Sequence, residues 1–218
     1  MSYSYTLASA SKNELENHDA RRLKYNTLYP AVLNRYKKKT YVETGLWLGH
    51  GIRVALDCGF ESIYSCDINS KSVDLGTQMY GNNDNVKMYH AKSVDYLKML
   101  FQSNNLTENI TFFLDAHFGT EEEALELGGE FKSPLLEEIQ LIGKYCKDKD
   151  NVIMIDDYHK IEKWSHQKSE LEKNLLKINK DFKLTIQPRI VEEVAAWNTH
   201  INEALLKTSG EILVAKLS

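Results

Sequence analysis

The stretch TYVETGLWLGHGIRVALDCGFESIYSCDIN, residues 40–69, carries the pattern that decides the fold. Two β-forming segments enclose a glycine-bearing turn and an apolar helical run, and the second segment ends at Asp67. Glycines at such a turn let the backbone approach a ligand at a helix N-terminus, where free N–H groups gather. Asp67 follows the turn by about 20 residues, the spacing from which a carboxylate accepts hydrogen bonds from a ribose. The stretch therefore predicts a strand, helix and strand that bind a nucleotide.

The turn reads Glu43-x-Gly45-x3-Gly49-x-Gly51, and it resembles motif I of the class I S-adenosylmethionine-dependent methyltransferases. Asp67 then matches the acid at the end of the family's second strand. The resemblance implies that S-adenosylmethionine is the cofactor. The residues that it places around this methyl donor are Glu43, Thr44, Gly45, Gly49, Gly51, Asp67, Ile68, Ser93 and Asp115. An ordinary strand-to-helix turn, whose glycines serve only packing, stays open as an alternative.

A second segment, AKSVDYL at residues 91–97, resembles the stretch that the same family usually carries as G-D-S-x-x-x-L. Ala91 and Lys92 stand here where glycine and aspartate are common in the family. An acid is therefore not expected to recognise the adenine at this point. We expect Ser93 and the neighbouring backbone to do so instead.

Strand and helix signals alternate from residue 40 onward, without repeats or a convincing linker, which predicts one α/β domain. The resemblance specifies a Rossmann-like sheet of seven mostly parallel strands, with an antiparallel last strand and helices on both faces. We expect residues 1–39 to form a helical arm packed on the core, broken near Pro30, and residues 40–218 to form the methyltransferase domain. The later strands are expected at 62–66, 86–90, 109–114, 151–155, 182–186 and 211–217, and the helices at 70–80, 93–102, 134–146 and 161–178. A loop rich in glutamate and glycine is expected between residues 119 and 133.

Composition narrows the class of protein. The net charge of −4 provides no basic field for nucleic acid, so a nucleic-acid partner is not expected. No run of about 18 apolar residues occurs, and the polar N-terminal stretch does not resemble a secretory signal, so we expect a cytoplasmic protein without a membrane partner. The three cysteines, Cys58, Cys66 and Cys146, lack metal-type spacing and are interpreted as buried thiols. A homo-oligomer is compatible with this composition.

Acidic side chains follow two of the expected strands at the point where each strand ends. Asp115 comes directly after residues 109–114, and Asp156 and Asp157 come directly after residues 151–155. Ligands bind at the carboxyl ends of strands in open α/β sheets. Gathered carboxylates repel each other unless a cation, a proton or a basic side chain compensates them. Hard oxygen ligands of this kind suit magnesium or calcium better than zinc.

The strings LDAH and IDDYH, with the PLLEE helix start between them, resemble the metal-dependent O-methyltransferases, including the macrocin-type sugar methyltransferases. The resemblance implies that Asp115, Asp156 and Asp157 hold a divalent cation, and that the acceptor is the hydroxyl of a small molecule or sugar. A nearby histidine would remove the hydroxyl proton, and His117 is favoured slightly over His159. The plainer readings remain that the Asp156-Asp157 pair caps a helix and that His159 is a surface histidine.

Two other functional classes stay open. A nicotinamide-dependent oxidoreductase also uses a glycine turn and a distal acid, although its fingerprint spacing is missing here. A non-catalytic module that binds S-adenosylmethionine would keep the glycines and would not need the acids after the later strands.

Overall fold

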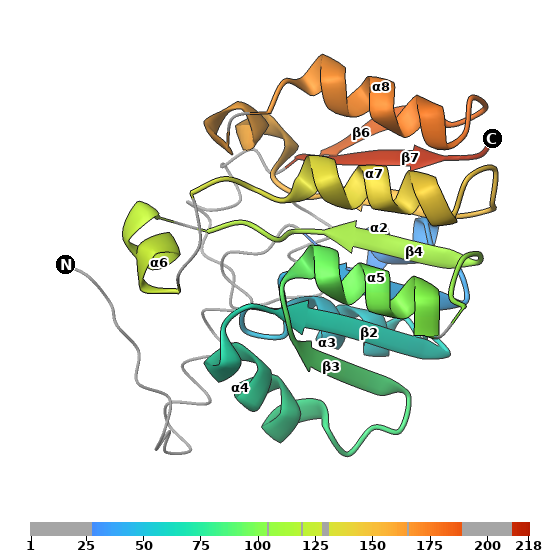
Figure 1. Cartoon of the computed structure of the whole chain (residues 1–218). Helices are drawn as coiled ribbons and strands as arrows, with labels where there is room; N and C mark the ends of the chain where they lie inside the picture. The colour runs from blue at the N-terminus through green and yellow to red at the C-terminus, as the bar shows by residue number, and fades with distance from the viewer. Residues whose placement is uncertain (1–27, 104, 119, 128–130, 165, 189–210) are drawn as a thin grey trace.

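The structure of the chain, a computed structural model, describes residues 28–103, 105–118, 120–127, 131–164, 166–188 and 211–218. Seven strands of this described part form one sheet in the order β3-β2-β1-β4-β5-β7-β6 (Figure 1). Strands β1 to β5 pair in parallel, whereas β7 runs antiparallel to both β5 and β6. The strands are β1 Thr40–Thr44, β2 Ser62–Asp67, β3 Val86–His90, β4 Ile110–Leu114, β5 Val152–Ile155, β6 Lys183–Pro188 and β7 Glu211–Lys216. The predicted seven-stranded, mostly parallel sheet with an antiparallel last strand is confirmed.

Helices cover both faces of the sheet (Figure 1). On one face lie α2 Pro30–Arg35, α3 His50–Asp57 and α4 Ser70–Tyr80, and on the other lie α5 Ser93–Ser103, α7 Leu135–Tyr145 and α8 Lys168–Ile178. Two short helices, α6 Glu121–Glu126 and the 3-10 helix η1 Tyr158–Trp164, follow the ends of β4 and β5. The predicted helices on both faces are thus confirmed.

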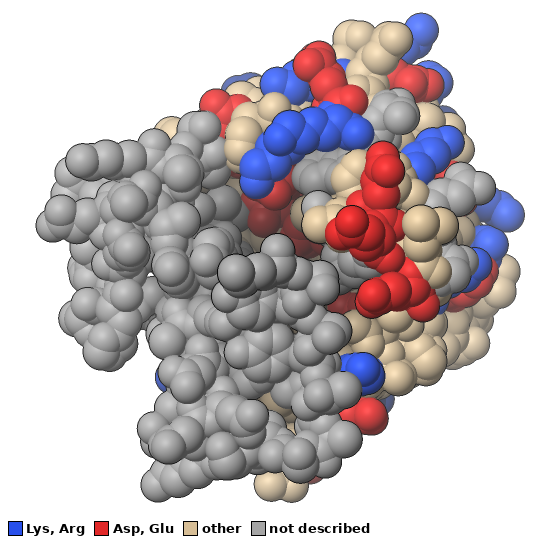
Figure 2. Space-filling model, turned by 90° about the vertical axis from the view of Figure 1, so that its left-hand side faces the viewer, with Lys and Arg blue, Asp and Glu red and all other residues tan. Residues whose placement is uncertain are grey.

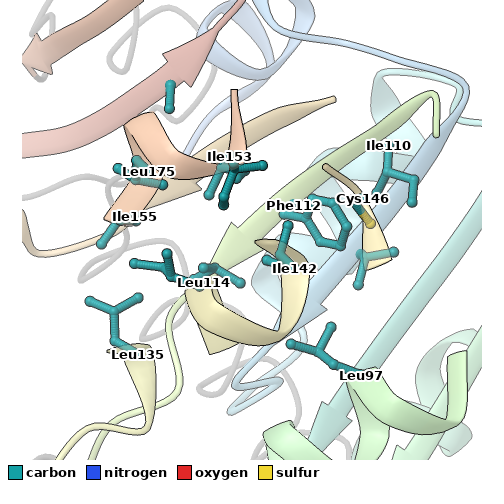
Figure 3. Close-up of a cluster of buried hydrophobic side chains, with 14 of the residues drawn as sticks. Leu97, Ile110, Phe112, Leu114, Leu135, Ile142, Cys146, Ile153, Ile155 and Leu175 are labelled. Atoms are coloured by element: carbon teal, nitrogen blue, oxygen red, sulfur yellow. The ribbon is translucent and has the colours of Figure 1, made fainter. Parts of the chain in front are cut away.

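The central strands are buried along their whole length. Every residue of β1, β4 and β5 is buried, as expected for parallel strands with helices on both faces. Figure 3 shows one side of this core, where Phe112 and Ile153 of the sheet lie among Leu97 of α5, Ile142 of α7 and Leu175 of α8. A one-residue slip in register would exchange the side chains that pack on the two helical layers, so packing on both faces fixes the register and the point where each strand ends.

Cysteine burial agrees with the sequence. Cys58, Cys66 and Cys146 are buried free thiols. Burial raises the pKa of Cys146 to about 12, which leaves this thiol without nucleophilic character at neutral pH.

Several local expectations were wrong. The single helix expected at 161–178 is two elements, η1 and α8, and the expected loop after β4 contains α6, whose sequence EEEALE consists of good helix formers. Pro30 begins α2, a position where its missing N–H costs no hydrogen bond, and the expected break of the arm near Pro30 stays a prediction because residues 1–27 lie outside the described part.

The described part of the predicted N-terminal arm packs on the core. Leu28, Tyr29, Val32 and Leu33 are buried against the α3 face, and His50 of α3 contacts the Leu28 carbonyl oxygen at 2.7 Å. Residues 1–27 lie outside the described part, so the division at residue 39 stays a prediction. Within the described residues no helix is both long enough and apolar enough to cross a membrane.

Candidate active site

The carboxyl ends of four parallel strands meet at one edge of the sheet. Thr44 pairs with Cys66 and with Leu114, and Leu114 pairs with Ile155. The residues that come next along each strand, Gly45, Asp67, Asp115 and Asp156, therefore lie at the same edge. Figure 2 faces this end of the molecule, where acidic side chains gather beside a few basic ones.

At two positions, the glycine turn has a backbone conformation that only glycine adopts without strain. Gly45 and Gly49 have φ angles of +87° and +73°. A Cβ atom at Gly45 would lie 2.5 Å from the Asp115 carbonyl oxygen, and one at Gly49 would lie 2.8 Å from the Tyr80 ring. The turn is thus pressed against the end of β4 and against α4, which brings the predicted donor turn next to Asp115.

Asp67 is held at the same turn by two backbone N–H groups. Its carboxylate accepts hydrogen bonds from the Trp47 N–H and the Asn69 N–H, each at 2.8 Å. Trp47 adopts φ of +44°, which a non-glycine residue rarely does, and this conformation supplies the first of these bonds. Ile68 is partly buried, and its carbonyl oxygen lies 3.0 Å from His90 Nε2. The structure therefore brings the predicted ribose acid and the glycine turn together.

Glu43 lies behind the turn rather than in front of it. The Ser65 hydroxyl donates to Glu43 Oε2 at 2.6 Å and the Tyr41 hydroxyl donates to Oε1 at 3.1 Å, and the side chain is buried. Burial raises the pKa of Glu43 to about 8, so the folded protein keeps this carboxyl protonated at neutral pH. The free energy of unfolding that this proton contributes is lost as pH rises from about 4.5 to about 8. In this position Glu43 supports the turn from beneath.

Gly51 of α3 makes room for that carboxyl group. A Cβ atom there would overlap Glu43 Oε1 and would lie 2.7 Å from the Tyr41 hydroxyl oxygen. Gly51 thus allows α3 to pack closely on β1. This is the packing role that the alternative interpretation, an ordinary strand-to-helix turn, gave to the glycines.

A histidine and a lysine compensate the acids that follow β4 and β5. His117 Nε2 lies 3.2 Å from Asp115 Oδ1 and 3.8 Å from Asp157 Oδ2. The Lys160 ammonium donates to both carboxylate oxygens of Asp157, each at 2.9 Å. Asp156 is buried beside this group and lines a small pocket with Asp115. The predicted set of Asp115, Asp156, Asp157 and His117 is therefore brought together.

The two candidate base histidines differ in their protonation. Burial lowers the pKa of His117, but its hydrogen bond to Asp115 and the charges of Asp115, Asp157 and Asp156 outweigh burial and raise the pKa to about 9. His159 Nδ1 lies 4.0 Å from Asp157, and burial lowers the pKa of His159. In the unliganded protein His117 is thus an imidazolium at neutral pH, whereas His159 is neutral.

The expected magnesium site is not supported by this geometry. Asp157 is occupied by Lys160 and Asp115 by His117, so basic side chains provide the compensation that a cation was expected to provide. Among the described residues no group of three or more His, Cys, Asp or Glu side chains has the arrangement of a metal site.

Two residues with a place in the site were not singled out from the sequence. Lys160 lies in the first turn of η1, three residues after Asp157, and this short spacing is the signal in the sequence that could have identified it. Glu138 follows Glu137 in PLLEE, and only burial distinguishes the two, since Glu138 is 0% exposed and Glu137 is exposed.

The fold is shared with solved methyltransferases. An O-methyltransferase from Bacillus cereus in complex with S-adenosylhomocysteine has a TM-score of 0.59 at 13% identity, over 97% of this chain and 93% of that one. TomG, an O-methyltransferase of Streptomyces achromogenes involved in tomaymycin synthesis and solved with S-adenosylmethionine, has a TM-score of 0.59 at 12% identity, over 97% and 93%. The sequence matches no protein-family model and no curated protein. At these identities the likeness establishes the methyltransferase fold, and the function has to be argued from the site.

Replacing Gly51 by alanine tests the packing behind the turn. We expect Gly51→Ala to lower the free energy of unfolding by about 1–3 kcal/mol, because the new methyl group overlaps Glu43. Gly143→Ala in α7 is the control, since its Cβ atom would lie 3.3 Å from only one flexible atom, Cγ1 of Ile178, and alanine favours a helix by about 1 kcal/mol. Urea unfolding of both variants measures the difference, and equal midpoints would contradict the packing described here.

Proposed function

We propose that this chain is an S-adenosylmethionine-dependent methyltransferase that acts on a hydroxyl oxygen of a small molecule or sugar. The observation that carries the proposal is the Asp67 carboxylate, held at the glycine turn by the Trp47 and Asn69 N–H groups. A carboxylate in that place suits a ribose diol, and the adjoining turn offers N–H groups at the start of α3. Support comes also from the sheet order, which is that of a fold found in structures solved with this donor or its product.

His117 and Asp115 are proposed as the pair that removes the hydroxyl proton. The acceptor oxygen attacks the methyl carbon, the carbon–sulfur bond breaks, and the cationic donor becomes neutral S-adenosylhomocysteine. His117 Nε2 faces the Asp115 carboxylate and Nδ1 lies 3.5 Å from the Phe118 carbonyl oxygen, so the ring that takes the proton is stabilised by acceptors on both nitrogens. A bound sulfonium next to the imidazolium disfavours the charged ring, so donor binding itself lowers the pKa of His117 toward neutrality.

The divalent cation that the sequence suggested is not needed for this proposal. Lys160 and His117 already compensate Asp157 and Asp115, and the residues present do not fit a magnesium site, so no step is routed through a metal ion. The net charge of −4 and the exposed acidic helix α6 near the site argue against a polyanionic acceptor such as nucleic acid. The cytoplasmic location and the oligomeric state stay predictions of the sequence.

Calorimetric titration with S-adenosylhomocysteine tests the donor site. We expect micromolar binding, and we expect Asp67→Asn to weaken it about 10- to 100-fold, because hydrogen bonds to a charged group contribute about 1.5–3 kcal/mol. Asp74→Asn, on the exposed face of α4, removes the same charge away from the turn and should leave the affinity unchanged. A wild-type protein that binds NAD and not S-adenosylhomocysteine would replace the proposal by an oxidoreductase.

The protonation of His117 tests the proposed base. We expect its pKa, followed by NMR of labelled histidine, to be about 9 in the free protein and to fall when S-adenosylmethionine binds. S-adenosylhomocysteine lacks the sulfonium charge and should shift the pKa far less. Asp115→Asn should also lower the pKa, since it removes the opposite charge at 3.2 Å. Equal pKa values in the two complexes would mean that His117 does not face the reacting sulfur.

Magnesium titration of the metal-stripped protein tests the absence of a cation site. We expect no heat of binding at millimolar magnesium and no effect of magnesium on S-adenosylhomocysteine affinity. Lys160→Met removes the ammonium group that holds Asp157 and should raise the affinity for divalent cations. Tight magnesium binding by the wild type, lost in Asp115→Asn, would restore the metal-dependent reading.

A further inference from the structure

Glu138 is a buried carboxyl group that the mechanism above does not use. It lies near the start of α7 and is 0% exposed, and neither Oε1 nor Oε2 has a hydrogen-bond partner among the described residues. A buried carboxylate without donors is costly, because its charge is neither solvated nor hydrogen-bonded. Such a group in a folded protein calls for a physical explanation.

Polar side chains from two other elements surround this carboxyl group. Burial raises the pKa of Glu138 to about 7, and the nearby hydroxyls of Ser93, at the start of α5, and of Thr44, at the end of β1, oppose this rise. Thr44 Oγ1 likewise has no hydrogen-bond partner among the described residues. Glu138 also lines the small pocket that Asp115 and Asp156 share at the strand ends. The carboxyl group is therefore placed directly behind residues that the donor site uses.

Ser93 is the residue that connects Glu138 to the donor. Ser93 comes shortly after the end of β3. That end lies beside Asp67, the proposed ribose ligand, because the Ala91 N–H donates to the Asp67 carbonyl oxygen at 3.0 Å. A base attached to a ribose at Asp67 therefore reaches the start of α5. No acid follows β3 directly in the loop, since Ala91 and Lys92 stand there. Glu138, on α7, is a buried acid that lies near the Ser93 hydroxyl.

We infer that Glu138 is a positioning residue that orients the Ser93 hydroxyl for recognition of a 6-aminopurine. The inference rests on the proposed function, because it assumes that the donor site binds S-adenosylmethionine. A hydroxyl group has one hydrogen to donate and two lone pairs to accept with. Above about pH 7 Glu138 is a carboxylate, and a Ser93 hydroxyl that turns its hydrogen toward it keeps its lone pairs to accept a hydrogen bond from the exocyclic amine of adenine.

The same orientation excludes a 6-oxopurine. Hypoxanthine presents a carbonyl oxygen where adenine presents its amine, and this oxygen would face the Ser93 lone pairs without a donor between them. A site that offers only a hydrogen-bond acceptor discriminates strongly against a ligand that also presents an acceptor, because both polar groups are then left unpaired. Glu138 thus sets base specificity without touching the base.

The test compares S-adenosylhomocysteine with S-inosylhomocysteine, its 6-oxo analogue, by calorimetry. We expect the wild type to prefer the adenosyl compound about 100-fold and Glu138→Gln to lower this preference about tenfold. Glutamine offers an NH₂ donor beside its carbonyl, so the Ser93 hydroxyl is no longer held in one orientation. Glu137→Gln, on the exposed face of the same helix turn, removes the same charge and should keep the wild-type preference.

A second variant tests the inference from the other partner. Ser93→Ala leaves Glu138 in place, and it should lower the adenosyl preference to the Glu138→Gln value, with no further loss in the double variant. The inference is overturned if Ser93→Ala keeps the wild-type preference, or if folded Glu138→Gln weakens both nucleosides equally, since the carboxyl group is then structural only. A wild type that binds neither nucleoside refutes the proposed function itself, which is a distinct result.

Discussion

Strand β1 pairs in parallel with β2 on one side and with β4 on the other, and every part of the site depends on this pairing. Parallel strands end at the same edge, so the residues that follow them come together although they are far apart in the sequence. Gly45 packs closely against the Asp115 backbone, so the ends of β1 and β4 are in direct contact. The proposed donor turn and the proposed reaction site therefore lie side by side at one edge of the sheet.

That edge concentrates negative charge, and the protein compensates it with side chains. Asp67 is held by backbone N–H groups, Asp115 by His117, and Asp157 by Lys160. The hydrogen bond to Asp115 and the charges of Asp115, Asp157 and Asp156 outweigh burial and raise the pKa of His117 to about 9. In the proposed reaction a cationic donor would be attracted by the carboxylates at this edge, and its charge would lower the pKa of His117.

Two buried acids support the site from opposite faces of the sheet. Glu43 lies beneath the glycine turn on the α3 face, where Tyr41 and Ser65 hold it. Glu138 lies on the α5 and α7 face behind Ser93 and Thr44. Burial raises the pKa of both carboxyl groups, to about 8 and about 7. Their positions fix the glycine turn on one side and the start of α5 on the other.

The sequence by itself determined the fold class, most strand and helix positions and the polar residues at the strand ends, because periodicity and glycine turns are local properties of the chain. It predicted α4 Ser70–Tyr80 and β3 Val86–His90 at their observed bounds. The local sequence pattern did not determine which acidic side chains are buried and which basic groups lie beside them. Only the tertiary structure placed Glu43 behind the turn, buried Glu138 while Glu137 stayed exposed, and brought Lys160 to Asp157 in place of the expected cation. Burial and charge compensation arise from elements packed against one another, and no spacing along the chain records them.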